Sequence, residues 1–319
     1  MQKVGKYVLS GLWIALLVMW PLNSNVGPKD SDRDDPHLRS EEGLYKSTLT
    51  RAPFGMLGVN FFESDNGKKR WNIRSKFAEL HRKENYAHLQ EVNADFFAEK
   101  TGNMVQTKSN YGRSHIDKHL VELEGDVSIK SRRGYLFEMD RLNYDGKTNE
   151  FTTEDIVHMK GPDVKRPTMF LKGEGLIGNI DTEHFLLKKS VTAQRQLKNL
   201  DWLRISSRSG EFFTEDQRAV FIGKVRSTLP KVTIDSDIFE LNITQERESI
   251  QARGNVFLRQ KDKIGHAEMA SMEVGSNKIV LEGNARIDSK DNQILGRRIV
   301  LYSDEDRVEV EAAEGKVRN

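Results

Sequence analysis

Apolar and polar residues alternate along most of the chain after about residue 60. The alternation is clearest in residues 121–129, 250–258 and 279–287. Because successive side chains of a strand point to opposite faces, a period of two predicts half-buried antiparallel strands. Turn signals such as Asp145-Gly146 separate the runs. The body of the chain is therefore predicted to be all-β.

Two stretches do not show this period clearly. Residues 87–101 place Leu89, Val92 and Phe96 at a spacing that suits a helix as well as a bulged strand, and we predict a strand. Residues 192–202 lack clean alternation. We predict a connector there, with a helix as the alternative.

A short unit recurs within the predicted strands: an apolar run, then Gly, a polar residue, and Val or Ala. A glycine inside a strand usually marks a bulge or a close approach of two backbones. Repetition of such a bend at the same level of each strand would curve the whole sheet. Its last four copies are spaced by 31, 29 and 32 residues, and the glycines of all five are Gly125, Gly223, Gly254, Gly283 and Gly315.

The N-terminal segment has the character of a membrane anchor. Residues 7–22 carry no charge and would form about 24 Å of helix, which residues 4–22 extend toward a full span. Lys3 and Lys6 precede the span, so the positive-inside rule predicts export of the remainder. We predict an anchor over 1–22 and a flexible tether over 23–58. The alternative is a cleaved signal peptide, although no small-residue cleavage site follows the apolar run.

The composition narrows the class of protein. The formal net charge is +2, the mean hydropathy is −0.63 and apolar residues make up 37% of the chain. These values argue against a strongly basic nucleic-acid binder and against a polytopic membrane protein. A length of 319 residues suits about two domains. The chain has no Cys, which excludes disulfides, thiolate metal sites and a Cys nucleophile.

The residues offer no clear catalytic or metal site. His115 and His119 lie four apart in a stretch that reads as strand, without a third ligand, and we interpret them as surface histidines. Carboxylates are plentiful but occupy the polar positions of the alternation, as solvated strand faces do. Basic doublets such as Arg132-Arg133 are interpreted as exposed turn or edge residues, with contact to anionic headgroups as the alternative. We predict no catalytic residue, no metal and no cofactor.

Several short segments, in order, resemble the LptC family, the membrane-anchored periplasmic component of lipopolysaccharide export. Those that carry this resemblance are Trp71–Ser75, Val92–Phe97, Leu123–Val127, Gly134–Phe137, Leu142–Asp145 and Leu171–Leu176. Residues 203–319 are similar to an OstA-like or LptA-like domain. The matching segments there are Ala219–Val225, Ala252–Val256, Ile279–Ala285 and Ile294–Ile299.

The resemblance implies a fold, a function and partners. The fold would be two consecutive twisted, partly open antiparallel β-jellyrolls over 59–200 and 201–319, after one N-terminal transmembrane helix. The function would be binding and transfer of lipopolysaccharide from the inner-membrane ABC transporter across the periplasm. Further partners would be an LptA-like bridge subunit or the outer-membrane LptD-like receptor. The chain would sit in the inner membrane with its bulk in the periplasm.

The inward positions of the alternation then become candidates for an apolar lipid groove, because a splayed β-sandwich exposes its core faces. The last alternating run, residues 307–312, is predicted as a docking edge with Val308 and Val310; the alternative is that it pairs internally. Two other functions stay open: an anchored structural or adhesion protein with a filled core, and an enzyme acting on polysaccharide with a carboxylate cleft. The groove candidates are Val121, Leu123, Val127, Ile129, Phe137 and Met139 in the first domain, and Ile250, Val256, Leu258, Ile279, Leu281 and Ile287 in the second.

Overall fold

The computed structural model describes residues 54–317, apart from 66, 82–84, 99–102, 116, 245–246, 291, 304 and 306, with side chains as far as Glu311. The predicted anchor, residues 1–22, lies outside the described residues. The predicted tether over 23–58 is too long at its end, because the first strand already begins at Gly55. Among the described residues, none forms a helix with the length and apolar character needed to cross a bilayer.

The described chain is an antiparallel sheet of 18 strands, which confirms the all-β prediction. The first nine are β1 (Gly55–Asp65), β2 (Lys68–His81), β3 (Tyr86–Phe97), β4 (Met104–His115), β5 (Leu120–Lys130), β6 (Leu136–Asp145), β7 (Glu150–Gly161), β8 (Met169–Asn179) and β9 (His184–Gln196). The others are β10 (Trp202–Ser207), β11 (Ser209–Phe213), β12 (Arg218–Thr228), β13 (Thr233–Ile243), β14 (Glu248–Gln260), β15 (Lys263–Glu273), β16 (Lys278–Ser289), β17 (Asn292–Tyr302) and β18 (Val308–Val317).

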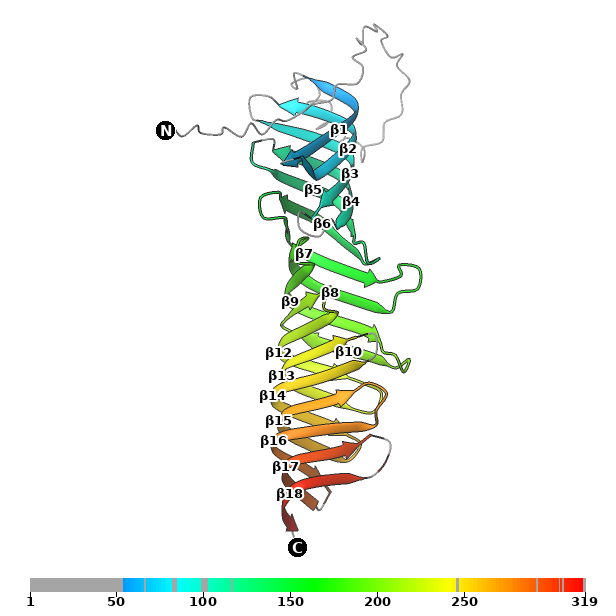
Figure 1. The fold of residues 1–319 in the computed structure, drawn as a ribbon, viewed down its shortest axis with the longest axis vertical. Coiled ribbons are helices and arrows are strands. Elements are labelled where there is room, and N and C mark those ends of the chain that lie inside the picture. The colour runs from blue at the N-terminus through cyan, green and yellow to red at the C-terminus, as the bar shows by residue number, and fades with distance from the viewer. Residues whose placement is uncertain are drawn as a thin grey trace, which may run out of the picture.

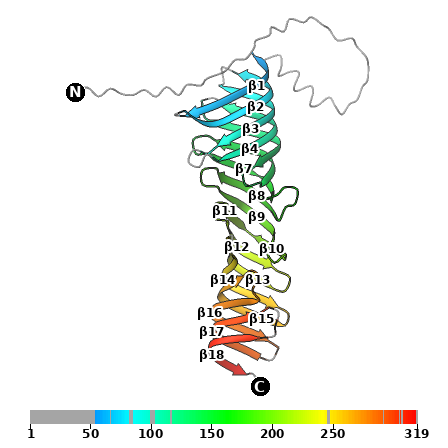
Figure 2. The ribbon, with the colours of Figure 1, turned by 45° about the vertical axis from the view of Figure 1, so that its right-hand side comes forward.

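The strands follow one another as a meander and stack into a long column, with β1 at one end and β18 at the other (Figures 1 and 2). Each strand pairs with its neighbours in the sequence, and β10 and β11 together fill one position between β9 and β12. Within the described residues, β1 pairs with β2 alone and β18 with β17 alone. The column therefore ends in two strand edges.

Most strands bend sharply near their middle, and the bends line up as a spine along the column. The ladder register shifts at this level in every pairing from β4–β5 to β8–β9 and from β12–β13 to β16–β17. At one such bend Gly254 and Asn255 have φ values of 75° and 47°, a left-handed pair that glycine makes accessible.

The recurring glycine unit is therefore confirmed as a bulge at four of its five positions: Gly125, Gly223, Gly254 and Gly283. Gly315 is the exception, because β18 pairs with β17 in unbroken register past it. Asparagine side chains brace the spine across neighbouring strands. Asn255 Nδ2, for example, donates to Asp237 Oδ2 over 2.7 Å.

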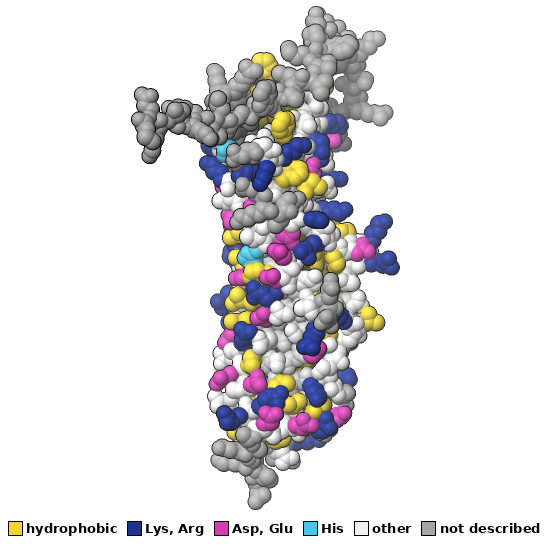
Figure 3. Space-filling view, in the orientation of Figure 1, with side chains coloured by type: hydrophobic (Ala, Val, Ile, Leu, Met, Phe, Trp, Pro, Cys, Tyr) yellow, Lys and Arg dark blue, Asp and Glu magenta, His cyan; other side chains and the backbone are white. Residues whose placement is uncertain are grey.

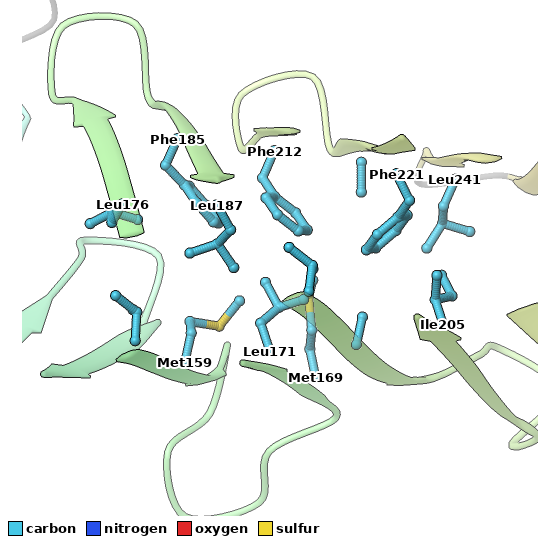
Figure 4. Close-up of a cluster of buried hydrophobic side chains, with 14 of the residues drawn as sticks. Met159, Met169, Leu171, Leu176, Phe185, Leu187, Ile205, Phe212, Phe221 and Leu241 are labelled. Carbon is cyan, nitrogen blue, oxygen red and sulfur yellow. The ribbon is translucent and has the colours of Figure 1, made fainter. Parts of the chain in front are cut away.

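The bends fold the sheet into two facing walls with one continuous core between them. Figure 4 shows this near the middle of the column, where Phe185 and Phe212 lie on one wall and Met159 and Met169 on the other. The ring centroids of Phe137 and Phe185 lie 5.1 Å apart although β6 and β9 do not pair. The buried apolar cluster runs from Trp71 to Leu301 without a break.

The two ambiguous stretches resolve differently. The strand predicted over 87–101 is confirmed by β3 as far as Phe97, and residues 99–101 lie outside the described residues. The connector predicted over 192–202 is wrong for its first half, because β9 continues to Gln196, and only residues 197–201 form a turn. Both β10 and β11 pair with β9, so the ladder passes through this region without interruption. The division into two consecutive, partly open jellyrolls over 59–200 and 201–319 remains a prediction.

Charged side chains of both signs are mixed along the visible face of the column, with small apolar patches between them (Figure 3). Many form cross-strand pairs, such as Arg141 with Asp155 at 2.6 Å and Arg226 with Asp235 at 2.7 Å. This mixture on the visible face agrees with the small net charge of the chain.

Candidate functional site

The free ends of the bent strands form two rims that face each other on the side opposite the spine. Rim A carries the turns that follow β1, β3, β5, β7, β9, β12, β14 and β16, and rim B carries the others. No backbone ladder joins the two rims among the described residues. The line where they meet, which we call the seam, is therefore held by side chains alone.

An apolar pocket with a cavity volume of about 100 Å³ opens along the seam beside the β5–β6 turn. We call the wall that ends in rim A wall A and the wall that ends in rim B wall B. Wall A contributes Val105, Ile129 and Phe137 to the pocket, and wall B contributes Leu176 and Phe185. Polar residues of the turns lie at its edge, so the pocket combines an apolar interior with a polar mouth. Such a combination suits an amphipathic ligand.

A second pocket, with a cavity volume of about 300 Å³, adjoins the first and shares Arg133, Tyr135, Phe185 and Thr214 with it. Its walls include the side chains of Met159, Met169 and Phe212, which Figure 4 shows facing one another. Because its lining extends from Arg133 to Ile243, the second pocket spans the turn at 197–201.

Cationic and aromatic side chains frame this double pocket. The Arg218 guanidinium lies 4.0 Å from the centre of the Phe213 ring, and the His184 ring stacks on Phe213 at 4.6 Å. His184 Nε2 is buried and has no hydrogen-bond partner in the described part of the chain. Arg132 Nη1 donates to Asn103 Oδ1 over 2.7 Å. Arg132, His184 and Arg218 all line the double pocket.

Glu183 on rim B binds two side chains of rim A. It accepts hydrogen bonds from Asn103 in the β3–β4 turn and from Arg133 Nε over 2.9 Å. Thr214 Oγ1, on the same rim as Glu183, adds a third bond of 3.1 Å. All four residues line the first pocket.

Glu248 forms a second crossing of the seam. Its side chain is only 2% exposed, and its oxygens accept from Arg195 Nη2 over 3.1 Å and from the Lys198 backbone N–H over 2.7 Å. Glu248 begins β14 on rim B, whereas Arg195 and Lys198 flank the end of β9 on rim A. We call the Glu183 and Glu248 clusters the seam straps.

Two further contacts cross the seam nearer the column's ends. Glu63 Oε1 lies 2.6 Å from His119 Nδ1. The Trp71 indole N–H donates to the other carboxylate oxygen, Glu63 Oε2, over 2.7 Å. Gln260 Nε2 donates to the Tyr302 carbonyl over 3.1 Å. The seam is thus bridged at intervals along its length.

The twelve predicted groove side chains are all buried, with exposed fractions from 0 to 9%. Only Ile129 and Phe137 among them line the double pocket. The structure packs the other ten against the opposite wall: Val121, Leu123, Val127, Met139, Ile250, Val256, Leu258, Ile279, Leu281 and Ile287. Contact of any of the twelve with lipid stays a prediction.

Sequence reasoning missed most of the pocket, including Val105, Phe151, Leu176, Phe185 and Phe212. These residues stand near strand ends, where the alternation gives way to turns. The sequence does carry a signal for the pocket, because bulky aromatic residues recur at inward positions next to turns. The alternation alone does not distinguish these residues from ordinary core residues.

The histidine prediction needs correction. The stretch from His115 to His119 is not one strand, because residues 117–119 form the turn between β4 and β5. His119 is partly buried against Glu63 rather than a free surface residue. No group of three or more metal-binding side chains occurs in the part of the chain that the structure describes.

Two titrating groups away from the pocket are perturbed by burial. Burial of His88, followed by the charge of Arg113, lowers the pKa of that imidazole. Burial also raises the pKa of Tyr144, whose hydroxyl donates to Asn149 Oδ1 over 2.8 Å. Neither group faces the double pocket.

The predicted docking edge coincides with β18. Val308 pairs with Leu301 and Val310 with Ile299, both on β17. Within the described residues no strand pairs with the other side of β18. The backbone on that side is therefore open, and its use by a partner stays a prediction.

Comparison with known proteins places both halves of the chain. Residues 57–196 match the LptC-related lipopolysaccharide-assembly family, and residues 204–307 match the family of LptA and LptD N-terminal-domain lipopolysaccharide transport proteins. A search of curated proteins finds no match. A crystal structure of LptH, the LptA-homologous periplasmic component of the lipopolysaccharide transport device of Pseudomonas aeruginosa, is 17% identical, covers 37% of this chain and 95% of its own, and has a TM-score of 0.35.

The two matched ranges together cover most of the chain and meet at the 197–201 turn. Both families serve lipopolysaccharide assembly or transport, and neither is a family of enzymes. The chain therefore joins an LptC-like domain to an LptA-like domain and belongs to the lipopolysaccharide transport machinery of the periplasm.

Proposed function

We propose that the chain carries lipopolysaccharide along its column, with the acyl chains between the two walls and the sugars outside the seam. Lipid enters near β1, passes the double pocket and leaves near β18. The observation that carries this proposal is the double pocket itself, whose lining continues from the LptC-like range into the LptA-like range.

Burial of acyl chains supplies a driving force for such a path. Each buried CH₂ contributes about 0.8 kcal/mol, so a chain of about 12 carbons gains roughly 9 kcal/mol before ordering costs. The walls must separate to admit it beyond the pocket, because inward residues such as Val256 and Leu281 are 2% and 0% exposed. Since no backbone ladder crosses the seam, separation breaks side-chain contacts only.

The partners follow from the two ends of the column. The N-terminal anchor over 1–22 would keep the β1 end beside the inner-membrane ABC transporter. The β18 end would dock on an LptA-like bridge subunit or on the outer-membrane LptD-like receptor through strand addition. The fusion joins the anchored component to a first bridge domain in one chain.

Photo-crosslinking in cells tests the path. A photoreactive residue at Phe137 or Ile129, which line the pocket, should capture lipopolysaccharide. The same residue at Glu122, whose side chain is 46% exposed on the outer face of β5, should not. In the second half, Leu281 should capture lipid and the outward Glu282 should not. Equal capture from inward and outward positions would contradict the proposed path.

A further inference from the structure

The seam straps close the column's cross-section into a ring. Wall A, the spine and wall B are joined by continuous backbone ladders, and each strap bridges the remaining gap between the rims. At the Glu183 strap the bridge runs to Asn103 and Arg133, and at the Glu248 strap it runs to Arg195 and Lys198. Whatever lies between the walls at these levels is encircled by protein.

A lipid carried in the proposed manner cannot slide through such a ring. Its acyl chains lie inside, its sugars lie outside, and the bonds between them pass through the seam. Each strap blocks the part of such a molecule that passes through the seam. Travel along the column therefore requires the strap to open, and the ring can close again only after the lipid has passed.

We propose that Glu183 and Glu248 are gates that release and re-form once for each lipid that passes, and that the double pocket holds the lipid between them. This proposal rests on the proposed function. The pocket has the required position, because Glu183 lines its first lobe and Arg195, the partner of Glu248, lines its second.

The chemistry of the straps suits repeated opening. Each strap consists of hydrogen bonds and ion pairs, so water can replace the partners of both charges when the rims part. The backbone ladders of the walls stay intact during this step. Glu248 is almost fully buried and Glu183 is 17% exposed, so the two gates differ in how much dehydrated charge they release. Opening of the Glu248 strap therefore rehydrates more buried charge than opening of the Glu183 strap.

Locking a strap tests the proposal in the full-length chain. The chain has no Cys, so Asn103→Cys with Glu183→Cys supplies a unique thiol pair across the seam. A short, cleavable, thiol-specific crosslinker then holds the strap shut. Photoreactive residues at Leu123 and Leu281 report lipopolysaccharide before and after the straps. With the strap locked, capture at Leu281 should be lost and capture at Leu123 retained, and cleavage of the crosslinker should restore both.

The control pair is Asn103→Cys with Arg132→Cys, which lie 2.7 Å apart at their polar atoms on the same rim. Crosslinking this pair should leave capture at Leu281 unchanged. A second pair across the seam, Arg133→Cys with Thr214→Cys, keeps Glu183 itself and should block in the same way. Undiminished capture at Leu281 through either locked strap would overturn the gate proposal. Absence of capture at both positions before locking would overturn the lipid-carrying function on which it rests.

Discussion

Arg195 Nη2 lies 3.1 Å from Glu248 Oε1, although 53 residues separate them and their strands, β9 and β14, share no ladder. The contact joins the last strand of the LptC-like range to the LptA-like range across the seam. It adds a side-chain lock to the continuous ladder and so fixes the two halves relative to each other.

Removal of Glu248 should destabilise the chain strongly. Glu248→Ala leaves the Arg195 guanidinium, 16% exposed, without its carboxylate, a situation that costs about 3–5 kcal/mol. Urea unfolding followed by tryptophan fluorescence measures the loss. The control is Glu273→Ala, which removes a loose, exposed partner of Arg247 at 3.9 Å and should cost less than about 1 kcal/mol. Similar losses in the two variants would contradict the role assigned to the buried strap.

The spine should be more sensitive to added side chains than the turns. Gly283 and Gly275 both have a left-handed backbone, with φ of 77° and 87°, so alanine costs about 1–2 kcal/mol at either. At Gly283 a Cβ would also lie 2.7 Å from Cβ of Glu268, whereas at Gly275 nothing lies within 4 Å. Gly283→Ala should therefore unfold at lower urea than Gly275→Ala. Equal midpoints would mean that the bend adjusts freely.

Filling the pocket should block lipid without unfolding the protein. Val105 lines the first pocket, whose cavity volume is about 100 Å³, so the larger side chain of Val105→Phe has room and should lower lipopolysaccharide capture at Phe137. Val256→Phe instead inserts the same extra bulk where the residue is 2% exposed and should cost about 1–3 kcal/mol. Capture assays and urea midpoints on both variants check the contrast. An unchanged capture in Val105→Phe would argue against occupancy of this pocket.

Proline substitutions should distinguish the side of β18 that pairs with β17 from its free side. The Tyr302 N–H donates to the Arg307 carbonyl, so residues 307 and 309 bond to β17 and the N–H of Val308 points to the free edge. Val308→Pro should thus abolish partner binding with little loss of stability, and Glu309→Pro should break the ladder to β17. Co-purification with the bridge or outer-membrane partner, together with urea midpoints, distinguishes them. Retained binding in Val308→Pro would exclude this edge as the docking site.

Acid should weaken the β2–β4 region through His88. Since burial lowers its pKa below the ordinary 6.5, the unfolded chain binds a proton more readily than the folded chain. The stability that neutral His88 supports is complete above about pH 6.5 and declines as the pH falls toward the lowered pKa. His88→Gln should flatten the dependence of the urea midpoint on pH. Arg113→Gln, which removes one cause of the lowered pKa, should flatten it in part; an unaltered slope in both would refute this assignment.

The alternation in the sequence sufficed to predict the strands and their inward faces, because burial on one side of a strand leaves a local period of two. Leu281 and Val256 illustrate this, and Gly254 shows that the bends also leave a local mark. Gly315 has the same local sequence but lies in the last strand, where no further strand imposes a register shift. Local pattern therefore predicts a bend only within a paired stack.

The seam was beyond such reasoning. Asn103 and Glu183 are 80 residues apart, and each sits in a turn whose polar sequence is typical of exposed loops. Their contact depends on how far the two walls shear past each other, which is a property of the whole stack. The same holds for Glu63 and His119. The stretch around His119 was predicted as a strand, but residues 117–119 form a turn that places the imidazole on the rim opposite Glu63.

The nearly sequential pairing of the strands also bears on how such a chain is made. A protein delivered through a narrow export channel emerges from one end and must protect its apolar surface before the remainder arrives. In this meander each newly emerged strand finds its earlier neighbours already in place, so the ladder can grow at the pace of delivery. Only the side-chain bridges between the rims must wait, since their later partners emerge 42 to 80 residues behind. The walls can thus be complete at a given level before the opening opposite the spine is fastened there.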